Sequence, residues 1–286
     1  MTQFRFNDDF SSAGLSDPGL ARTENEDRFS VDSAARLLLV ADGVGGHNSG
    51  EIASSKAVAA LREHLSGAED DDDTATEDET ITLVDKPYPS MFDLSGHDSR
   101  SRDSTTQEEA RIAAAVKQAN RVVHDINRQQ DLAPELAMGT TILGLQFRLG
   151  RPLEATIFHV GDSRLYLLRD DRLAQITRDH SAYEKWLADG ETGPTPPKNI
   201  ILQAIGPTAE VVPSMRTGRF LPGDLILMCS DGLNDMVDND EIHDLLSSIE
   251  RENLTAGCQR LIDASNSNGG TDNTTVVLGA FANRSS

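Results

Sequence analysis

The chain has 286 residues, and its 26 lysines and arginines against 47 aspartates and glutamates give a formal net charge of −21. That charge argues against nonspecific binding to nucleic acid or to an anionic membrane, and it favours divalent cations or basic proteins as partners. Because no apolar run approaches the ~18 residues of a membrane span, and because the two cysteines lack a matched set of Cys or His ligands, we expect a cytoplasmic protein without a disulfide scaffold or zinc site.

The first charged segment, residues 16–27, combines a Pro-Gly turn with an extended stretch that leads into a predicted strand. Runs of charge usually form solvated faces. Arg22, Glu26 and Asp27 therefore become relevant to chemistry only if this segment folds back over a site that is formed elsewhere in the chain.

An apolar run over residues 37–41 comes next, and its lack of alternation is typical of a strand covered on both faces. The run stops at Asp42, and the glycines that follow permit a tight turn and a close approach of the backbone. Asn48 precedes Glu51 by three residues, the spacing of a capping box, which predicts that a helix begins there. The sequence thus places a carboxylate between a buried strand and a helix.

Two long helices with an unusual connection are predicted next. Residues 48–65 carry an apolar stripe among small residues, and we expect Ile52 to belong to it. Residues 107–130 keep apolar side chains at helical spacing. Between the helices, residues 67–106 are polar and in part strongly acidic, so we interpret them as a disordered insertion within one domain.

The second half of the chain contains short apolar runs joined by turn residues. Strands are predicted over residues 140–147, 155–160, 164–168, 225–229 and 274–281, and helices over residues 182–190, 240–249 and 255–265. Residues 191–198 hold three prolines and a glycine and form a predicted projecting loop. Short connections between strands require antiparallel pairing, and hairpins cluster apart from helices, so the predicted fold class is α+β.

Aspartate also stands at three later element ends, as Asp162, Asp231 and Asp272. Each aspartate alone is explained by ordinary turn chemistry. Together with Asp42 they favour a carboxylate cluster, which repels itself unless a cation lies within it. Oxygen ligands without matched histidine or cysteine select magnesium or manganese, so we predict a two-ion site for phosphoryl or hydrolytic chemistry, with an arginine for the phosphoryl oxygens.

Other catalytic sites are excluded by spacing. Gly43, Gly45 and Gly46 lack the third glycine of a dinucleotide fingerprint, and no lysine follows to complete a phosphate-binding loop. Asp235, rather than an arginine, follows Cys229 by six residues, and this acidic neighbourhood argues against a thiolate phosphatase.

The ordered motifs resemble those of the bacterial metal-dependent type-2C (PPM family) serine/threonine protein phosphatases. The motifs are Ser-Asp-Pro-Gly-Leu-Ala-Arg-Thr-Glu-Asn-Glu-Asp, Val-Ala-Asp-Gly-Val-Gly-Gly-His, Gly-Thr-Thr, Val-Gly-Asp-Ser-Arg, Arg-Asp-His-Ser, Cys-Ser-Asp-Gly-Leu and Asp-Asn-Thr-Thr. The resemblance implies one catalytic domain over residues 1–286, a four-layer αββα sandwich of two antiparallel β-sheets flanked by helix pairs. It also implies hydrolysis of phosphoserine and phosphothreonine in proteins, by in-line attack of a water that bridges two metal ions.

The resemblance also assigns roles to individual residues. The metal ligands would be Asp42, the carbonyl of Gly43, Asp231 and Asp272, with a weaker third manganese or magnesium ion at Asp162, Asp231 and Asp235. Metal-bound waters would be held by Glu26, Asp27 and Asn273. Arg22 would bind the phosphoryl group, so the predicted catalytic residues are Arg22, Asp42 and Asp231.

The sequence leaves two candidates for the general acid that protonates the leaving group. Some relatives carry a histidine directly after the metal-binding Asp-Gly pair, whereas this chain has Val44 there and a histidine only at His47. His47 is then a residue at the start of a helix, and a metal-bound water is the other source of the proton. We interpret His159 and His180 as structural residues.

The predicted partners are phosphorylated proteins and a cognate Ser/Thr kinase, without nucleic acid or membrane, and we expect a monomer. The alternative is a pseudophosphatase that keeps its affinity for metals and phosphopeptides and regulates a partner through the acidic insertion. The complete set of carboxylates, together with Arg22, favours the enzyme.

Overall fold

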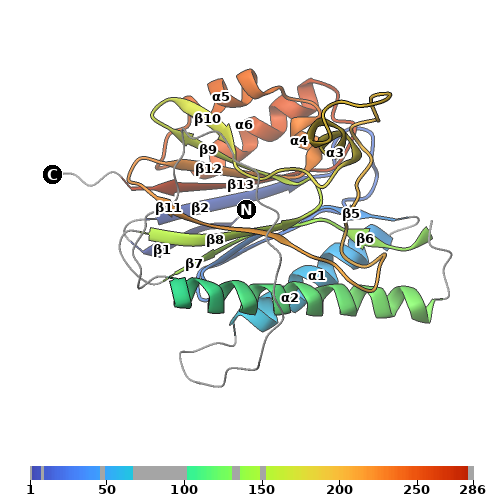
Figure 1. The fold of residues 1–286 in the computed structure, drawn as a ribbon. Helices are drawn as coiled ribbons and strands as arrows, with labels where there is room; N and C mark the ends of the chain where they lie inside the picture. Colours follow the sequence, from blue (N-terminus) through green and yellow to red (C-terminus); the bar gives the residue numbers. More distant parts are fainter. Residues whose placement is uncertain are drawn as a thin grey trace.

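The structure is a computed structural model that describes residues 2–7, 10–45, 49–66, 102–130, 136–148 and 153–282. Two antiparallel sheets lie face to face, and helices cover the outer face of each sheet (Figure 1). The predicted α+β class and the four-layer sandwich are therefore confirmed. Within the described ranges, no helix is both long enough and apolar enough to cross a membrane.

Sheet A has the strand order β1-β2-β13-β12-β9-β10. In that order its strands are Thr2–Asn7, Phe10–Asp17, Thr274–Phe281, Leu225–Cys229, Arg164–Arg169 and Arg172–Gln175. β12 and β13 are buried along their whole lengths, as their continuous apolar sequences predict. β1, β2 and β10 were not predicted, because their sequences mix polar and apolar residues without a sustained pattern.

Sheet B has the order β11-β8-β7-β4-β3. In that order its strands are Ser214–Phe220, Leu153–Val160, Ile142–Phe147, Leu37–Ala41 and Arg28–Asp32. All five residues of β4 are buried, as the apolar run predicts. The predicted strand over residues 140–147 is divided, since β6 (Gly139–Thr140) leaves sheet B and pairs with β5 (Gly43–Val44).

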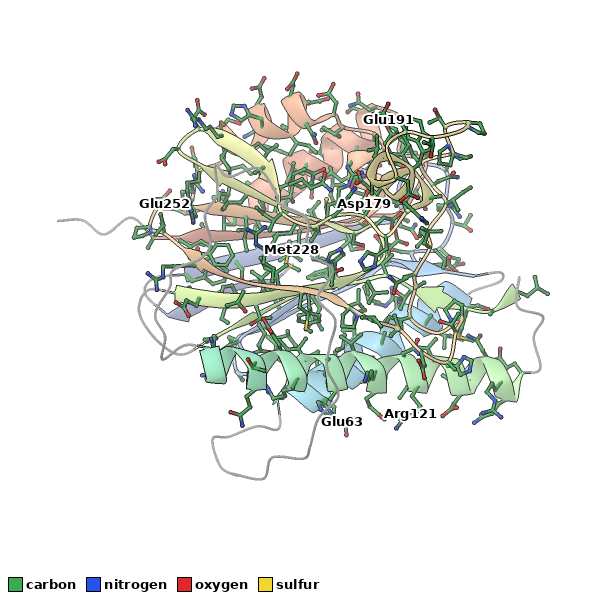
Figure 2. The ribbon with its side chains drawn as sticks, in the orientation of Figure 1. Glu63, Arg121, Asp179, Glu191, Met228 and Glu252 are labelled. Carbon is green, nitrogen blue, oxygen red and sulfur yellow. The ribbon has the colours of Figure 1, made fainter. Side chains whose placement is uncertain are left out.

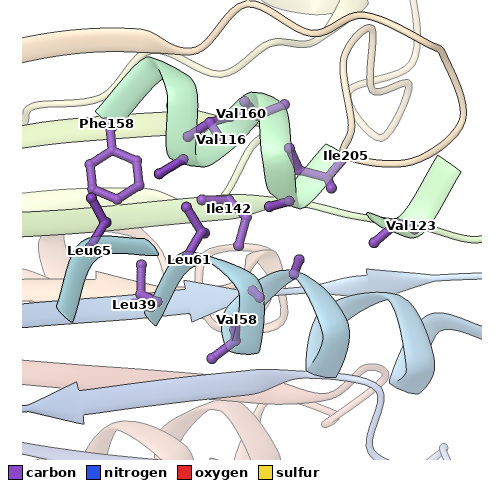
Figure 3. Close-up of a cluster of buried hydrophobic side chains, with 14 of the residues drawn as sticks. Leu39, Val58, Leu61, Leu65, Val116, Val123, Ile142, Phe158, Val160 and Ile205 are labelled. Carbon is purple, nitrogen blue, oxygen red and sulfur yellow. The ribbon is translucent and has the colours of Figure 1, made fainter. Parts of the chain in front are cut away.

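Helices α1 (Ser49–Ser66) and α2 (Arg102–Gln129) pack on sheet B. Figure 3 shows Leu61 of α1 and Val116 of α2 converging with strand residues in one buried apolar cluster. Ile52 lies outside this cluster with 41% of its surface exposed, so its predicted place in the stripe is wrong. Buried alanines, Ala53 and Ala57, take the helix close to the sheet instead.

The predicted insertion, residues 67–106, lies outside the described residues as far as residue 101. Its last part is helical, because α2 begins at Arg102 rather than at residue 107. The prediction of disorder is therefore wrong for residues 102–106.

Helices α5 (Asn239–Ser247) and α6 (Leu254–Ser267) pack on sheet A, after the short α4 (Asp231–Asn234). α5 and α6 both begin at capped ends. The side chain of Asp238 accepts from the amide of Glu241, and the side chain of Asn253 accepts from the amide of Ala256. The third apolar layer lies between the two sheets. A short α3 (Ala182–Ala188) precedes the exposed loop predicted over residues 191–198.

Candidate metal centre

The candidate site lies where the chain crosses between the two sheets. Residues 161–163 connect β8 of sheet B with β9 of sheet A, and Asp162 lies on that turn. The charged segment of residues 18–27 connects β2 of sheet A with β3 of sheet B. Both crossings occur at the same end of the sandwich, which brings polar loops from the two sheets together.

Antiparallel pairing brings the other aspartates to this end. Cys229, the last residue of β12, pairs with Val276 near the start of β13, so Asp231 and Asp272 leave sheet A at the same edge. Asp42 directly follows β4 of sheet B. The two sheets therefore contribute carboxylates to one region, although these residues are far apart in sequence.

The main chain of Asp42 is held in place by two threonines. Its amide donates to Thr141 Oγ1 at 2.9 Å, and its carbonyl accepts from the amide of Thr141 at 2.8 Å and from Thr140 Oγ1 at 2.9 Å. Thr141 Oγ1 also lies 2.7 Å from Ser163 Oγ, next to Asp162. These bonds use only the backbone of Asp42, so its carboxylate is available for the site.

The carboxyl groups of Asp42 and Asp231 lie close enough together for their charges to act on each other. Burial and the charge of Asp231 raise the pKa of Asp42 well above its usual range. Burial also raises the pKa of Asp231 to about 6, and the charges of Asp235 and Asp272 add to this rise. Two neighbouring carboxyl groups repel each other when both are charged, and either a shared proton or a divalent cation compensates this repulsion.

Two buried carboxylates have an oxygen that is not hydrogen-bonded to any described residue. Asp27 accepts from Ser230 Oγ at 2.7 Å through Oδ2, whereas its buried Oδ1 has no partner. Asp162 is only 7% exposed, and its Oδ1 is also unpartnered. Burial raises the pKa of each group to about 7, and the neighbouring charge of Asp231 contributes to both rises. Such unsatisfied oxygens fit a cation or an ordered water.

The segment of residues 18–27 folds back over this region. The amides of Leu20 and Ala21 donate to the carbonyl of Gly270 at 2.7 and 3.2 Å. Asn273 Nδ2 donates to the carbonyls of Pro18 and Glu24 at 3.0 and 2.8 Å. This meets the condition under which the charged segment becomes relevant to chemistry.

Asn273 and Arg22 have clear structural partners. The side-chain oxygen of Asn273 accepts from the amide of Glu26 at 2.8 Å, so its amide group binds the main chain on both sides. That Asn273 holds a metal-bound water stays a prediction. Arg22 Nη2 lies 2.8 Å from Asp272 Oδ2, and both side chains are substantially exposed, so the pair contributes little to stability and instead holds the guanidinium at the site.

Glu26 and Gly43 meet the start of α1. Glu26 Oε1 accepts from the amide of Gly50 at 3.2 Å, and burial raises the pKa of this carboxylate. A Cβ on Gly43 would overlap the carbonyl oxygens of Gly50 and Glu26. Glycine is therefore required where the strand end, the charged segment and the helix come together.

Asp235 lies on the rim of the site. It follows α4 and is exposed, and partial burial raises its pKa while the charge of Arg164 opposes the rise. Arg164 itself binds Asp179 through Nε and Nη2, at 2.7 to 3.1 Å. No sequence pattern predicted this ion pair or the contacts of Ser230 and Thr141, although all of these residues lie within or beside the quoted motifs.

The histidines and Cys229 have structural surroundings. His47 lies outside the described residues. The rings of His159 and His180 stack with centroids 4.6 Å apart, and burial lowers the pKa of both, that of His180 to about 3. Burial also raises the pKa of Cys229 to about 12, which agrees with the exclusion of a thiolate mechanism, although burial rather than acidic neighbours is the main cause.

Among the residues that the structure describes, no three His, Cys, Asp or Glu side chains form an assembled metal site. The donors are nevertheless suited to a divalent cation, because they are buried carboxylates with raised pKa values and two unpartnered oxygens. The residues present therefore fit a magnesium or manganese centre.

Comparisons with known proteins agree with this chemistry. The family model of protein phosphatase 2C matches residues 21–259. The serine/threonine protein phosphatase PstP of Mycobacterium tuberculosis is 36% identical over 276 residues, which cover 93% of this chain but 44% of the relative. The protein phosphatase PhpP of Streptococcus pneumoniae is 30% identical over 272 residues, which cover 92% of this chain and 94% of the relative.

A solved structure also has the same fold. It is the catalytic domain of the serine/threonine protein phosphatase PstP in complex with two manganese ions. Its TM-score is 0.70 at 31% sequence identity, and the match covers 96% of this chain and 99% of that one. The chain thus spans less than half of the full-length mycobacterial relative but nearly all of this catalytic domain.

Proposed function

This chain belongs to the protein phosphatase 2C family, and we propose that it hydrolyses phosphoserine and phosphothreonine in proteins with the help of two divalent cations. The observation that carries the proposal is the proximity of the partly exposed carboxyl groups of Asp42 and Asp231 to each other and to the buried carboxylates of Asp27 and Asp162, each of which has an unpartnered oxygen. This cluster has an excess of negative charge that a phosphate could not approach without cations.

Two manganese or magnesium ions, when bound, would activate a water molecule and neutralise the charge that develops on the phosphoryl group. Asp42, the Gly43 carbonyl, Asp231 and Asp272 are the residues we propose to hold them. A third, weaker ion would be held by Asp162, Asp231 and Asp235. The dimanganese complex of the PstP catalytic domain supports the two-ion centre, and the third ion rests on carboxylate chemistry alone.

The protein's own groups would bind and orient the substrate. Arg22 is held beside the cluster through one terminal nitrogen by Asp272, and its half-exposed side chain is open to solvent. A planar, permanently charged fork suits the oxygens of a phosphoryl group. Asp272 therefore has two roles in the proposal: it is a metal ligand, and it orients Arg22.

Neighbouring groups would hold the carboxylates of Asp27 and Glu26 in place. Ser230 Oγ donates to Asp27 and accepts from the amide of Thr275 at 2.9 Å, so the carboxylate of Asp27 is tied to β13. Glu26 is tied to the start of α1 through Gly50. We propose that Glu26 and Asp27 orient water at the metal centre rather than contact phosphate.

The proposed partners are phosphorylated proteins and a cognate Ser/Thr kinase, and the proposed location is the cytoplasm. The alternative, a pseudophosphatase that only binds phosphoproteins, is not favoured, because the carboxylates and Arg22 that turnover requires are all present and lie at one end of the molecule.

A direct assay tests the proposal. The protein is incubated with an aryl phosphate or a phosphothreonine peptide in manganese, in magnesium, and in excess chelator. We expect turnover of both substrates with metal and none with chelator, with activity returning when manganese is added back. Metal-dependent binding of the phosphopeptide without hydrolysis would support the pseudophosphatase instead.

A further inference from the structure

The segment of residues 178–202 leaves the metal end of the sandwich, forms α3 and returns through an exposed loop. Its outgoing and returning arms pair with each other: Ser181 forms a bridge with Ile201, and the amide of Ala182 donates to the carbonyl of Ile200 at 2.8 Å. Figure 2 shows Glu191 of this segment on the opposite side of the molecule from Glu252, with Asp179 between them and nearer to Glu191. We call residues 189–200 the exposed loop.

His180 lies at the base of this loop and bonds through all of its polar groups. Its amide donates to the carbonyl of Gly161 at 2.9 Å, and its ring Nδ1 accepts from the amide of Gly161 at 3.2 Å. Its carbonyl accepts from the amide of Leu202 at 2.7 Å, and Nε2 lies 2.9 Å from Ser214 Oγ. One residue therefore joins the turn before Asp162, the returning arm of the loop and the start of β11.

The ring of His180 is also held from one side. It stacks on His159 of β8, and His159 Nε2 bonds to the carbonyl of Arg178 at 2.8 Å. This fixes the ring plane, so that Nδ1 points at Gly161. Gly161 itself has little room to adjust, since its φ of +105° suits glycine and a Cβ there would press on Thr141.

The returning arm is tied to the other side of the metal centre. Ile205 and Thr140 exchange two backbone hydrogen bonds, at 2.8 and 3.0 Å, and Thr140 Oγ1 donates to the carbonyl of Asp42. The loop is therefore anchored on Asp162 through His180 and on Asp42 through Thr140. One network of hydrogen bonds therefore fixes the position of the loop together with the positions of these two aspartates.

We propose that His180 is a positioning residue that couples the exposed loop to the turn carrying Asp162, through the acceptor role of its Nδ1. The coupling itself is a property of the fold, whereas its effect on turnover rests on the proposed phosphatase function. A substrate that presses on the exposed loop would then shift Asp162, and an ion bound at Asp162 would order the loop.

Two substitutions of His180 distinguish the roles of its two ring nitrogens. In His180→Asn the side-chain oxygen occupies the place of Nδ1 and keeps an acceptor for Gly161, whereas in His180→Gln the terminal amide occupies the place of Nε2 and keeps only the Ser214 contact. His180→Ala removes both contacts. Ser214→Ala is the matched control, because it removes the partner of Nε2 and leaves the bond to Gly161 in place.

The first measurement is independent of activity. Amide exchange at Gly161 and tryptic cleavage after the exposed Lys198 are followed by NMR and mass spectrometry in chelator. We expect both to be roughly 3- to 10-fold faster in His180→Ala and His180→Gln, as for the loss of one hydrogen bond, and close to wild type in His180→Asn and Ser214→Ala. If His180→Ala does not fold, the asparagine and glutamine variants decide the matter.

The second measurement is the manganese dependence of turnover. His180→Gln should require roughly 3- to 10-fold more manganese for half-maximal rate than His180→Asn. Unchanged Gly161 exchange in all variants, or asparagine behaving like glutamine, would overturn the coupling. Absence of turnover in the wild type would overturn the proposed function alone, because exchange and cleavage would still report on the coupling.

Discussion

Two ends of sheet A bury aspartates in opposite ways. Asp224, before β12, is 1% exposed, and Arg169 binds both of its oxygens at 2.8 and 2.6 Å, while the amide of Leu221 donates at 2.8 Å. Asp162, at the other end, is 7% exposed and has an unpartnered oxygen. Burial of a carboxylate is therefore not by itself a sign of function; burial without a bound cationic partner is.

The contrast is sharper because an arginine lies close to Asp162 as well. Arg164 opposes the rise in the pKa of Asp162, yet it donates its hydrogen bonds elsewhere, to Asp179 and to the hydroxyl of Tyr166 at 3.2 Å. The protein thus places a cation near the cluster without neutralising it. A metal ion is left as the natural partner of the oxygens that remain.

The largest expected effect comes from a substitution of Asp231, the aspartate beside Asp42. Asp231→Asn should lower turnover on the order of 10²–10³-fold, because a charge-stabilising group is lost in a nearly isosteric change. Stability in chelator should not fall, since one member of a repelling pair becomes neutral, whereas the stabilisation that manganese provides should shrink. Steady-state kinetics and thermal unfolding with and without manganese check both statements. Wild-type activity would contradict the two-ion assignment.

The opposite end should respond in stability alone. Arg169→Met leaves Asp224 buried without its cation, and we expect a loss of about 3 kcal/mol in the free energy of unfolding, with turnover per folded molecule unchanged. The double variant Arg169→Met/Asp224→Leu should recover most of that loss, because it removes both charges. Denaturant unfolding of the two variants measures the difference. If the single variant were as stable as the wild type, Asp224 would not depend on its arginine.

Arg22→Ala separates substrate binding from metal binding. We expect catalytic efficiency to fall by about 1.5–3 kcal/mol in transition-state free energy, mainly through a higher KM, because a charge-assisted contact is lost. Manganese affinity should not fall, since Asp272 is released from an ion pair. Arg62→Ala, which breaks an exposed pair with Asp32 at 2.9 Å, is the matched control. Calorimetry showing weaker metal binding with an unchanged KM would argue against a phosphate role.

The pH dependence of stability should also distinguish the two ends. The pKa of Asp162 rises from 3.8 to about 7 on folding, so the folded state keeps a proton that the unfolded state releases in this window. The contribution of Asp162 is therefore present at low pH and is lost as the pH rises towards about 7. In chelator, Asp162→Asn should match the wild type near pH 4 and exceed it at pH 7.5 by about 2–4 kcal/mol. Parallel stability curves for the two proteins would show that Asp162 does not titrate in this way.

The smallest effect is expected from the connection between α1 and α2, which has no role in the comparison of Asp224 with Asp162. Arg111 of α2 donates to the carbonyl of Leu65 at the end of α1 at 3.2 Å, and Arg102, where α2 begins, lies roughly 13 Å along the helix from Arg111. Replacing residues 68–100 by about eight Gly and Ser residues should change stability by about 1 kcal/mol or less. Turnover of an aryl phosphate should survive, and selective loss with phosphoproteins at low salt would identify these residues as a recognition arm.

Local patterns were sufficient for the core elements and for selecting the aspartates of the candidate site. Continuous apolar runs predicted β4, β12 and β13, and helical periodicity predicted α2, because burial on both faces or on one stripe leaves a direct trace in sequence. The aspartates stood out because each lies at the end of such an element. The roles assigned to them, however, came from the resemblance to known phosphatases rather than from periodicity.

Only the tertiary structure decided how these pieces combine. Glu26 comes to the site through a hydrogen bond to Asn273 that spans 247 residues, and edge strands such as β10 and β11 form because a neighbouring strand supplies their partners. Turn chemistry by itself does not distinguish Asp224 from Asp162, since both are turn aspartates beside an apolar strand, and the motif resemblance singled out Asp162. What separates them is which arginine reaches them through space, and long-range packing sets that distance.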